Sequence, residues 1–379
     1  MGRLRVLQVG KFYPPDEGGM ETHLEGLCRH MSARADVEVL VAARGRRTVH
    51  ETIDGVPVTR VATLATVRSA PLCPELPWRI HARRTDIIHL HHPNPSAFAS
   101  YLASGHRGCL VVTYHSDVVQ QRVLNAVYAP IVNAVLRRSE AIIVSSREYL
   151  DTSPTLAPYA ARCAVIPMAI DPEAFAHADE SAVARIRATY GDRIVLTVGR
   201  LVYYKGIDHL IRAMPDIRAR LLVVGQGPMR DALEQEARRV GVADRVTFLG
   251  HVPETVPYYH AADVFALPSH LRSEAFGIVQ LEAMASGCPV VNTSIPSGVP
   301  SVSPNGVTGL TVPPANSEAL AAAINGLLDD PARRRALGSA GRQRVAAQYT
   351  LEGMTERTVL LYSEALARKT ARTGGSRRD

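Results

Sequence analysis

The stretch RIVLTVGRLVYYKGID, Arg193–Asp208, holds the pattern that decides the fold. It opens with a run of β-branched and aliphatic residues, which is typical of a strand. A loop with two cations, Arg200 and Lys205, then leads into a segment with helical periodicity. A strand followed by a short loop and a helix is the repeating unit of a parallel sheet with crossover helices.

The same unit recurs on both sides of this stretch. Similar short apolar runs are RVLQVG, VEVLVAA, DIIHLHH, CLVVTYHS and AIIVSS before it, and ARLLVVGQG, RVTFLG, DVFALPS and PVVNTS after it. The series is interrupted at Ile166–Phe175, where two prolines occur and periodicity is lost. The sequence therefore predicts an α/β protein with two doubly wound, Rossmann-like domains, residues 1–170 and 171–352.

Length and composition agree with two domains. A chain of 379 residues is too long for one compact core, and 46% hydrophobic residues are enough to fill two. No apolar run approaches the roughly 20 residues that span a bilayer, and no secretory cleavage pattern follows the first residues. We therefore expect a soluble, cytoplasmic protein, whose five scattered cysteines are reduced thiols.

The net charge of +7 is compatible with nucleic acid, an anionic membrane surface or a phosphorylated ligand as partner. Basic residues are dispersed, and no basic stripe interleaved with aromatic residues occurs, so nucleic-acid binding is not expected. The basic tail RKTARTGGSRRD is predicted to be a solvated, frayed end.

Candidate functional residues follow the strands, because ligands of open α/β sheets bind outside the carboxyl ends of the strands. Gly18 and Gly19 lie ahead of a helix predicted to start near Met20, where backbone N–H groups can approach an anion. An ordinary turn is an equally good interpretation of this pair alone. His115 ends a later strand beside Asp117, with a structural histidine as the alternative.

Two other patterns at strand ends give weaker evidence for a functional site. His89 and His91 alternate onto one face of a strand, but a zinc site needs further ligands nearby, so packing is expected. The stretch VVGQGP lacks the third glycine of a dinucleotide fingerprint, so NAD is not expected. No Asp-x-Asp pair occurs that would anchor a divalent cation.

The second half of the chain carries a basic pair and two glutamates. Arg200 and Lys205 are suited to neutralise a diphosphate. The alternative interpretation is that both are solvated cations on the surface. In SEAFGIVQLEAMASG, a helix is predicted to begin around Phe276–Gly277, with Glu274 just before it and Glu282 inside it. Eight residues of helix would separate the two acids by roughly 12 Å, about the reach from a hexose across a diphosphate to a ribose. N–H groups of the first helical turn would receive phosphate oxygens between them.

Together, SEAFGIVQLEAMASGCPVV, VGRLVYYKG and PPDEGGMETH resemble the retaining glycosyltransferases of family four, which have the GT-B fold. The resemblance covers nearly the whole chain, and HHPNP and TYHSD are most similar to enzymes of bacterial polysaccharide or secondary-metabolite biosynthesis. It implies an acceptor-side domain and a nucleotide-sugar-binding domain that face a central cleft. Residues 353–379 would form a helix that crosses back to the first domain, and then a basic tail. The junction reads IPMAID, with Ala169 where this family usually has glycine, which leaves the hinge geometry open.

The resemblance also implies roles for individual residues. Arg200 and Lys205 would hold the donor diphosphate and stabilise the leaving phosphate, Glu274 and His115 would bind the donor sugar, and Glu282 would bind the ribose. Further donor-binding residues implied are Gly18, Gly19, Val252, Phe276, Gly277, Ile278 and Val279, and acceptor-side residues are Tyr13, Met20 and Asp117.

The expected activity is retaining hexose transfer from a nucleoside-diphosphate sugar, without a cofactor or a metal, and with a uridine donor slightly favoured over a guanosine one. The acceptor would be a hydroxyl of a glycan, a lipid-linked glycan or a small metabolite. A nucleotide-sugar epimerase and a non-catalytic sugar-nucleotide-binding protein are the alternatives. Loops of the first domain, such as the proline-rich loop Thr66–Arg84, would recognise the acceptor. Its Trp78 would stack on a sugar, touch lipid or pack beneath the loop, and basic residues nearby leave open a peripheral contact with the inner membrane face.

Overall fold

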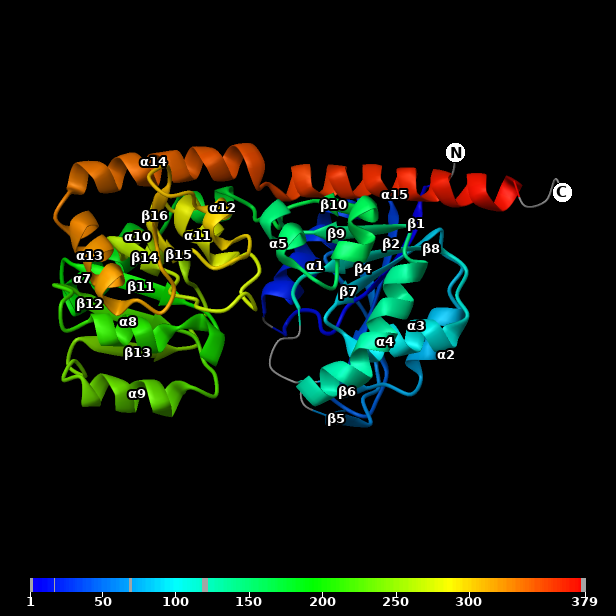
Figure 1. Cartoon of the computed structure of the whole chain (residues 1–379), viewed down its shortest axis with the longest axis horizontal. Coiled ribbons are helices and arrows are strands. Elements are labelled where there is room, and N and C mark those ends of the chain that lie inside the picture. Colours follow the sequence, from blue (N-terminus) through cyan, green and yellow to red (C-terminus); the bar gives the residue numbers. More distant parts are fainter. Residues whose placement is uncertain (1–2, 17, 68–69, 118–121, 376–379) are drawn as a thin grey trace. The chain divides into compact units, whose positions relative to one another are not determined.

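A computed structural model describes residues 3–16, 18–67, 70–117 and 122–375 (Figure 1). The chain divides into two units, an N-unit of Met1–Met168 with Leu351–Asp379, and a C-unit of Ala169–Thr350. Both boundaries lie two residues before those drawn from the sequence.

An eight-stranded sheet forms the centre of the N-unit, in the order β10-β9-β8-β7-β1-β2-β4-β3. Its strands are parallel except β3, which runs antiparallel to β4. The central strands are buried and mostly aliphatic because helices cover both faces of a sheet of this kind, although β7 also carries three histidines. The strands are β1 (Arg5–Val9), β2 (Asp36–Ala42), β3 (Val49–Ile53), β4 (Val56–Val61), β7 (Ile87–His92), β8 (Cys109–Tyr114), β9 (Ala141–Val144) and β10 (Cys163–Val165).

The last helix of the chain belongs to the N-unit and packs on α1 and β8. Its fully buried Tyr362 has its hydroxyl 2.9 Å from Gln8 Nε2 and 2.6 Å from His89 Nδ1, which lie on two central strands. The helices are α1 (Gly19–Met31), α2 (Leu76–His81), α3 (Pro95–Ser104), α4 (Arg122–Arg138), α5 (Arg147–Thr152), the 3-10 turn η1 (Ala157–Arg162) and α15 (Leu351–Gly375). The basic tail was expected to be frayed, but it is helical as far as Gly375, and residues 376–379 lie outside the described residues.

The C-unit is a second doubly wound layer around six parallel strands, in the order β13-β12-β11-β14-β15-β16. Apolar residues of the sheet, such as Leu221, pack against Leu210 of α8 and Ile324 of α13 in its core. The strands are β11 (Ile194–Val198), β12 (Arg220–Val224), β13 (Val246–Gly250), β14 (Val264–Ala266), β15 (Val290–Thr293) and β16 (Gly309–Val312). The helices are α6 (Glu173–Ala176), α7 (Glu180–Tyr190), η2 (Tyr203–Lys205), α8 (Ile207–Ala213), α9 (Arg230–Arg239), α10 (Val256–Ala261), α11 (Val279–Ala285), α12 (Val299–Val302), α13 (Ser317–Leu328) and α14 (Pro331–Gln348). The α/β class with two doubly wound sheets, predicted from the sequence, is confirmed.

The proline-rich segment Thr66–Arg84 is not the loop that the sequence suggested. It contains a small antiparallel pair, β5 (Ala65–Val67) with β6 (Ala70–Leu72), followed by helix α2. Trp78 lies on α2 with 73% of its surface exposed. The expectation that it packs beneath a loop is therefore wrong.

The junction with Ala169 does not need a glycine. Ala169 is buried and is not among the residues with positive φ, so a side chain fits its backbone conformation. The next residue, Ile170, donates its N–H to the carbonyl of Tyr349 at 3.0 Å and forms a parallel bridge with Thr350. The two places where the chain changes unit are thus tied to each other.

The remaining expectations about the class of protein concern thiols and membrane spans. All five cysteines are free thiols, as expected. Among the helices described, none has the length and apolar character to cross a membrane.

Candidate functional site

Two strand ends of the C-unit bring Lys205 and Glu274 together. Lys205 ends η2, which follows β11, and Glu274 lies on the loop after β14, the strand next to β11 in the sheet. Lys205 Nζ lies 2.6 Å from Glu274 Oε2, and only 13% and 11% of the two side chains are exposed. Two residues that the sequence placed in separate motifs thus form one buried ion pair.

This pair holds a cation in place inside the protein. Burial disfavours the ammonium form of Lys205, but the attraction of Glu274 and of other acidic groups outweighs it, so the pKa of Lys205 lies above its ordinary value. The Ser269 hydroxyl donates a hydrogen bond of 3.3 Å to the same oxygen of Glu274. The lysine is therefore charged and positioned before any ligand arrives.

Gly206 sets the position of Lys205. Its φ is +64°, and a Cβ atom there would lie 2.2 Å from the carbonyl oxygen of Pro268. The loop after β11 therefore lies directly against the loop after β14, and only glycine permits this approach.

Glu282 is held by a tyrosine that sequence reasoning missed. The hydroxyl of Tyr259, a fully buried residue of α10, donates a hydrogen bond of 2.7 Å to Glu282 Oε2. Burial raises the pKa of Glu282, while this hydrogen bond and the charge of Lys205 act against the rise. No sequence signal connected the two residues, because they are distant in the chain and Tyr259 sits in an ordinary apolar helix.

The loop between Glu274 and α11 offers a run of unpaired backbone donors. Helix α11 begins at Val279, later than the predicted start around Phe276–Gly277, because Gly277 has a φ of +75°. Residues 274–278 are not helical, so the predicted spacing of roughly 12 Å along a helix axis does not apply. In the described part of the chain, no acceptor is recorded for the N–H groups of residues 276–279, namely Phe276, Gly277, Ile278 and Val279. Successive free N–H groups of this kind form a concavity that suits an anion.

A buried network of hydrogen bonds holds the loop between Glu274 and α11 in place. Gln280 Nε2 donates to the carbonyl of Phe276 at 3.1 Å, and Asn292 Nδ2 donates to Gln280 Oε1 at 2.8 Å. The Thr311 hydroxyl donates to Asn292 Oδ1 at 2.7 Å, which extends the network from α11 through β15 to β16. Sequence reasoning missed Gln280 and Asn292, whose partners become visible only in the folded sheet.

Arg200 and Val252 lie at strand ends of the same sheet, after β11 and β13 respectively. Arg200 is exposed, and no ion pair is recorded for it among the described residues. Val252 is partly exposed. The structure therefore does not bring Arg200 into the buried Lys205–Glu274 pair, and its role stays a prediction.

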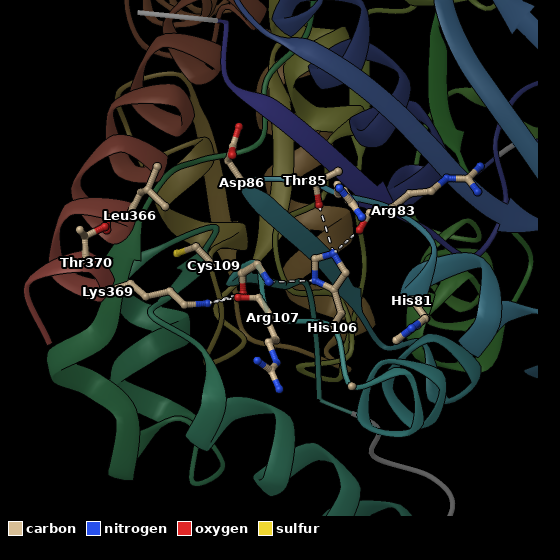
Figure 2. Close-up of a pocket in the computed structure, with 13 residues that line it drawn as sticks. His81, Arg83, Thr85, Asp86, His106, Arg107, Cys109, Leu366, Lys369 and Thr370 are labelled. Atoms are coloured by element: carbon tan, nitrogen blue, oxygen red, sulfur yellow. Dashed lines mark hydrogen bonds between the residues drawn. The ribbon is translucent and has the colours of Figure 1, made fainter. Parts of the chain in front are cut away.

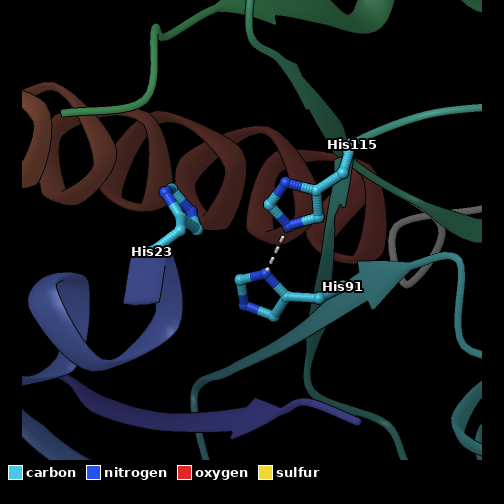
Figure 3. Close-up of side chains that lie close together, drawn as sticks. All are labelled: His23, His91 and His115. Carbon is cyan, nitrogen blue, oxygen red and sulfur yellow. Dashed lines mark hydrogen bonds between the residues drawn. The ribbon is translucent and has the colours of Figure 1, made fainter. Parts of the chain in front are cut away.

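In the N-unit, His115 is one of three buried histidines that lie together (Figure 3). It follows β8, and its Nε2 lies 3.1 Å from Nδ1 of His91 on β7. The ring of His23 on α1 lies edge-on to His115, with 5.0 Å between the ring centroids. Burial lowers the pKa of all three, in the case of His23 to about 4, so the rings are neutral. Sequence reasoning found His91 and His115 but missed His23, which reaches them from a separate helix.

The glycine pair begins α1, close to where the sequence placed a helix start. Gly19 is the first helical residue, and Gly18 caps the helix in an extended conformation. A Cβ atom on Gly18 would lie 2.3 Å from Glu21 Oε2. Both glycines are exposed, and Met20 is half-buried.

Two residues expected on the acceptor side have structural roles. Tyr13 is 1% exposed and belongs to the core, so its expected contact with an acceptor stays a prediction. Asp117 accepts the Tyr114 hydroxyl at 2.7 Å, and its backbone N–H donates to the Tyr149 hydroxyl at 2.5 Å. Asp117 thus anchors the chain just after His115.

A separate open cavity of about 490 Å³ lies at the opposite ends of the N-unit strands (Figure 2). Its wall includes Asp86 and Gly108, which directly precede β7 and β8. Lys369 of α15 donates to the carbonyl oxygens of Arg107 and Gly108 there. This cavity is far from the carboxyl ends of the strands along the sheet and holds none of the predicted site residues.

Comparison with known proteins gives the family. A family model described as Glycosyl transferases group 1 matches residues 180–344, and one described as Glycosyltransferase Family 4 matches residues 17–174. The O-antigen chain mannosyltransferase C of Escherichia coli is 31% identical over 97% of this chain and 100% of that protein. The GDP-mannose-dependent alpha-(1-6)-phosphatidylinositol monomannoside mannosyltransferase of Mycolicibacterium smegmatis is 32% identical over 89% of this chain and 92% of that protein.

A solved structure agrees with this assignment. Sucrose-phosphate synthase of Thermosynechococcus elongatus superposes with a TM-score of 0.82 at 25% identity, over 97% of this chain and 100% of that one. Its likeness covers both doubly wound units. The chain is therefore a glycosyltransferase of family four, with the GT-B fold.

Proposed function

We propose that the protein transfers a hexose from a nucleoside-diphosphate sugar to a hydroxyl acceptor with retention of configuration, and that it needs no divalent metal. The observation that carries this proposal is the buried Lys205–Glu274 pair beside the free N–H groups of residues 276–279. A cation and several N–H donors can bind the two phosphates of the donor, so a metal is not required to neutralise them.

The chemistry follows from where charge develops. Breaking the anomeric bond places negative charge on the terminal phosphate and positive character on the sugar. Lys205 and the loop N–H groups match the first charge, and fixed donors of this kind are often the largest catalytic contribution. Glu274 orients the sugar hydroxyls, and the departing phosphate helps to deprotonate the acceptor on the same face. Trapping of a glycosyl-enzyme adduct would contradict this front-face route.

The other donor contacts are assigned by the resemblance. Glu282, held by Tyr259, binds the ribose hydroxyls, and Val252 lies near the base. Arg200 supplies a second cation to the diphosphate. On the N-unit side, His115 contacts the sugar and the Gly18–Gly19 turn covers the diphosphate.

The names of the relatives favour guanosine over uridine in the donor. One is a mannosyltransferase of the O-antigen chain and another is named as GDP-mannose-dependent. We therefore propose GDP-mannose as the first donor to test, in place of the slight preference for uridine drawn from the sequence.

A thermal-shift panel tests the donor. GDP should raise the melting temperature by several degrees in the presence of EDTA, because a ligand that binds only the folded state stabilises it. UDP, ADP and NAD at the same concentration should give smaller shifts. Glu282→Ala should weaken the GDP shift, since the ribose contact is lost.

Glu318→Ala is the matched control, because Glu318 lies in the first turn of α13, on an exposed part of the C-unit. A GDP shift that needs a divalent cation would contradict the metal-independent proposal. A larger melting shift with UDP than with GDP would favour a uridine donor, as drawn from the sequence. A separate assay measures the release of GDP from GDP-mannose with and without an extract that contains glycan acceptors. Release that does not increase with any such extract would favour an epimerase or a binding protein.

The acceptor is proposed to be a lipid-linked glycan, reached by a peripheral contact of the N-unit with an anionic membrane surface. Four large apolar side chains between residues 64 and 78 are 45% exposed or more, and all lie on or next to β5, β6 and α2, namely Leu64, Val67, Leu72 and Trp78. Arg84 follows α2 and is exposed. Exposed apolar side chains, with an exposed cation in the same segment of the chain, are suited to the interface of an anionic bilayer.

Removal of Trp78 tests this contact. Trp78→Ala should weaken binding to phosphatidylglycerol vesicles by about tenfold or more, because burying a large apolar side chain is worth about 1.5–3 kcal/mol. Sedimentation with vesicles measures it. Leu360→Ala is the control, since Leu360 on α15 is 61% exposed and lies outside this segment. Equal binding of both variants, or no binding of the unchanged protein, would contradict the proposed contact.

A further inference from the structure

The three histidines of the N-unit are arranged in a way that packing alone does not explain. His23, His91 and His115 come from α1, β7 and the end of β8, and each exposes 7% of its surface or less. One ring nitrogen of each lies within 4.8 Å of those of the other two. Figure 3 shows the three rings turned toward one shared space.

His23 has no partner for either ring nitrogen among the described residues, although it is 4% exposed. A buried polar group without a hydrogen bond lowers stability, so such groups in folded proteins call for an explanation. A ligand that accepts a lone pair from the ring would give one of these two nitrogens a partner.

The hydrogen bonds around His91 aim its lone pair into the same space. Gln8 Nε2 donates to the Tyr362 hydroxyl at 2.9 Å, so Gln8 Oε1 faces His91 Nε2, at 3.0 Å. The amide oxygen accepts, and the proton of His91 is therefore on Nε2. The lone pair on His91 Nδ1 is left to face His115. Metal-binding histidines are held in this way, with the second ring nitrogen donating to an oxygen.

The separation of the nitrogens suits a tetrahedral metal. Zinc binds imidazole nitrogens at about 2.0–2.1 Å, which puts two ligand nitrogens of a tetrahedron about 3.3 Å apart. His91 Nδ1 and His115 Nε2 are 3.1 Å apart already. His115 would present its Nε2 lone pair after moving its proton to Nδ1, and His23 would supply the third nitrogen by a small movement of its ring.

We propose that His23, His91 and His115 form a binding site for Zn²⁺ with a fourth position open to water. Imidazole ligands suit zinc and neighbouring transition metals and do not suit magnesium or calcium. Zinc at this site engages His115, and so it inhibits the transferase. The inhibition rests on the proposed contact of His115 with the donor sugar, whereas zinc binding does not.

Calorimetric titration of the full chain, without a polyhistidine tag, with zinc chloride tests the site. The unchanged protein should bind one Zn²⁺ tightly, and Co²⁺ in its place should give the strong visible absorption of a tetrahedral site. His23→Phe should weaken Zn²⁺ binding by at least about 100-fold, since loss of a ligand costs no less than loss of an outer partner.

His23→Phe also separates loss of the site from loss of the fold. It removes two buried nitrogens that lack partners, so its melting temperature in EDTA should equal or exceed that of the unchanged protein. His30→Gln, on the same helix but bonded to the Gly26 carbonyl at 3.0 Å, should bind zinc as the unchanged protein does. Equal zinc affinity of the unchanged protein and His23→Phe would overturn the site.

Donor hydrolysis separates the two parts of the inference. Zinc should slow release of GDP from GDP-mannose by the unchanged protein and leave His23→Phe unaffected. Tight zinc binding without inhibition would overturn the contact of His115 with the sugar and keep the metal site. If no nucleoside diphosphate shifts the melting temperature and no nucleotide sugar is hydrolysed, the proposed function fails while the titration still decides the site.

Discussion

Lys205→Met is expected to lower the rate of donor hydrolysis about 100- to 1000-fold and to abolish the melting shift with GDP. Hydrolysis, in which water replaces the acceptor, reports on the leaving phosphate without knowledge of the acceptor. The loss of one preorganised group at a developing charge costs a factor of this size. The ion pair with Glu274 makes this lysine the most firmly positioned of the predicted cations. Methionine has an unbranched, flexible side chain of similar length, so packing changes little.

A second variant separates catalysis from stability. Lys205→Met leaves Glu274 buried without its cation, and loss of one partner of a buried pair costs about 3–5 kcal/mol of stability. Lys205→Met with Glu274→Gln removes both charges, so urea unfolding should show most of the stability regained while hydrolysis stays low. If the double variant recovers hydrolysis, the lysine is not the group that stabilises the leaving phosphate. Arg218→Met, at an exposed ion pair with Asp329, is the control and should leave hydrolysis unchanged.

Gly206→Ala is expected to destabilise the C-unit by more than about 2 kcal/mol and to weaken the GDP shift. The new Cβ would meet the carbonyl oxygen of Pro268 at 2.2 Å, and a backbone atom cannot move aside as a side chain can. Relief requires the loop after β11 to shift, and Lys205 shifts with it. Urea unfolding and the GDP melting shift measure the two effects.

Gly241→Ala is the matched control for this prediction. Gly241 has a similar φ of +73°, but nothing lies within 4 Å of its Cβ position. It should show only the cost of the left-handed conformation, about 1 kcal/mol. Equal destabilisation in both variants would contradict the contact between the two loops.

Much of the candidate site could be predicted from the sequence because its residues lie after strand ends. His115 directly follows β8, and Lys205 and Glu274 lie in the segments that follow β11 and β14. Within one sheet, parallel strands place such residues at the same edge, so the sequence predicts that Lys205 and Glu274 of the C-unit are neighbours. It does not predict which of them touch, and the ion pair between Lys205 and Glu274 appeared only in the structure.

What the sequence did not reveal depends on contacts between distant segments. Tyr259 holds Glu282, and Asn292 holds Gln280, through single hydrogen bonds that no spacing signals. His23 reaches the other histidines because α1 packs on the sheet. The start of α11 was placed too early because Gly277 sits in a left-handed conformation that only the folded loop reveals. The exposure of Trp78 depends likewise on a short helix that proline-rich composition concealed.

The position of α15 in the N-unit sets an order for folding during synthesis. The ribosome releases β1 first. Gln8 and His89 can form their hydrogen bonds with the Tyr362 hydroxyl only when residues 351–375 have emerged from the exit tunnel. By then the C-unit, Ala169–Thr350, is a continuous segment that has already left the exit tunnel. Domains fold as units as the chain appears, so the C-unit is complete first and the N-unit waits for the last helix. A nascent chain whose C-unit has left the tunnel, but whose α15 has not, would therefore carry a complete C-unit and an N-unit whose central strands still lack the last helix.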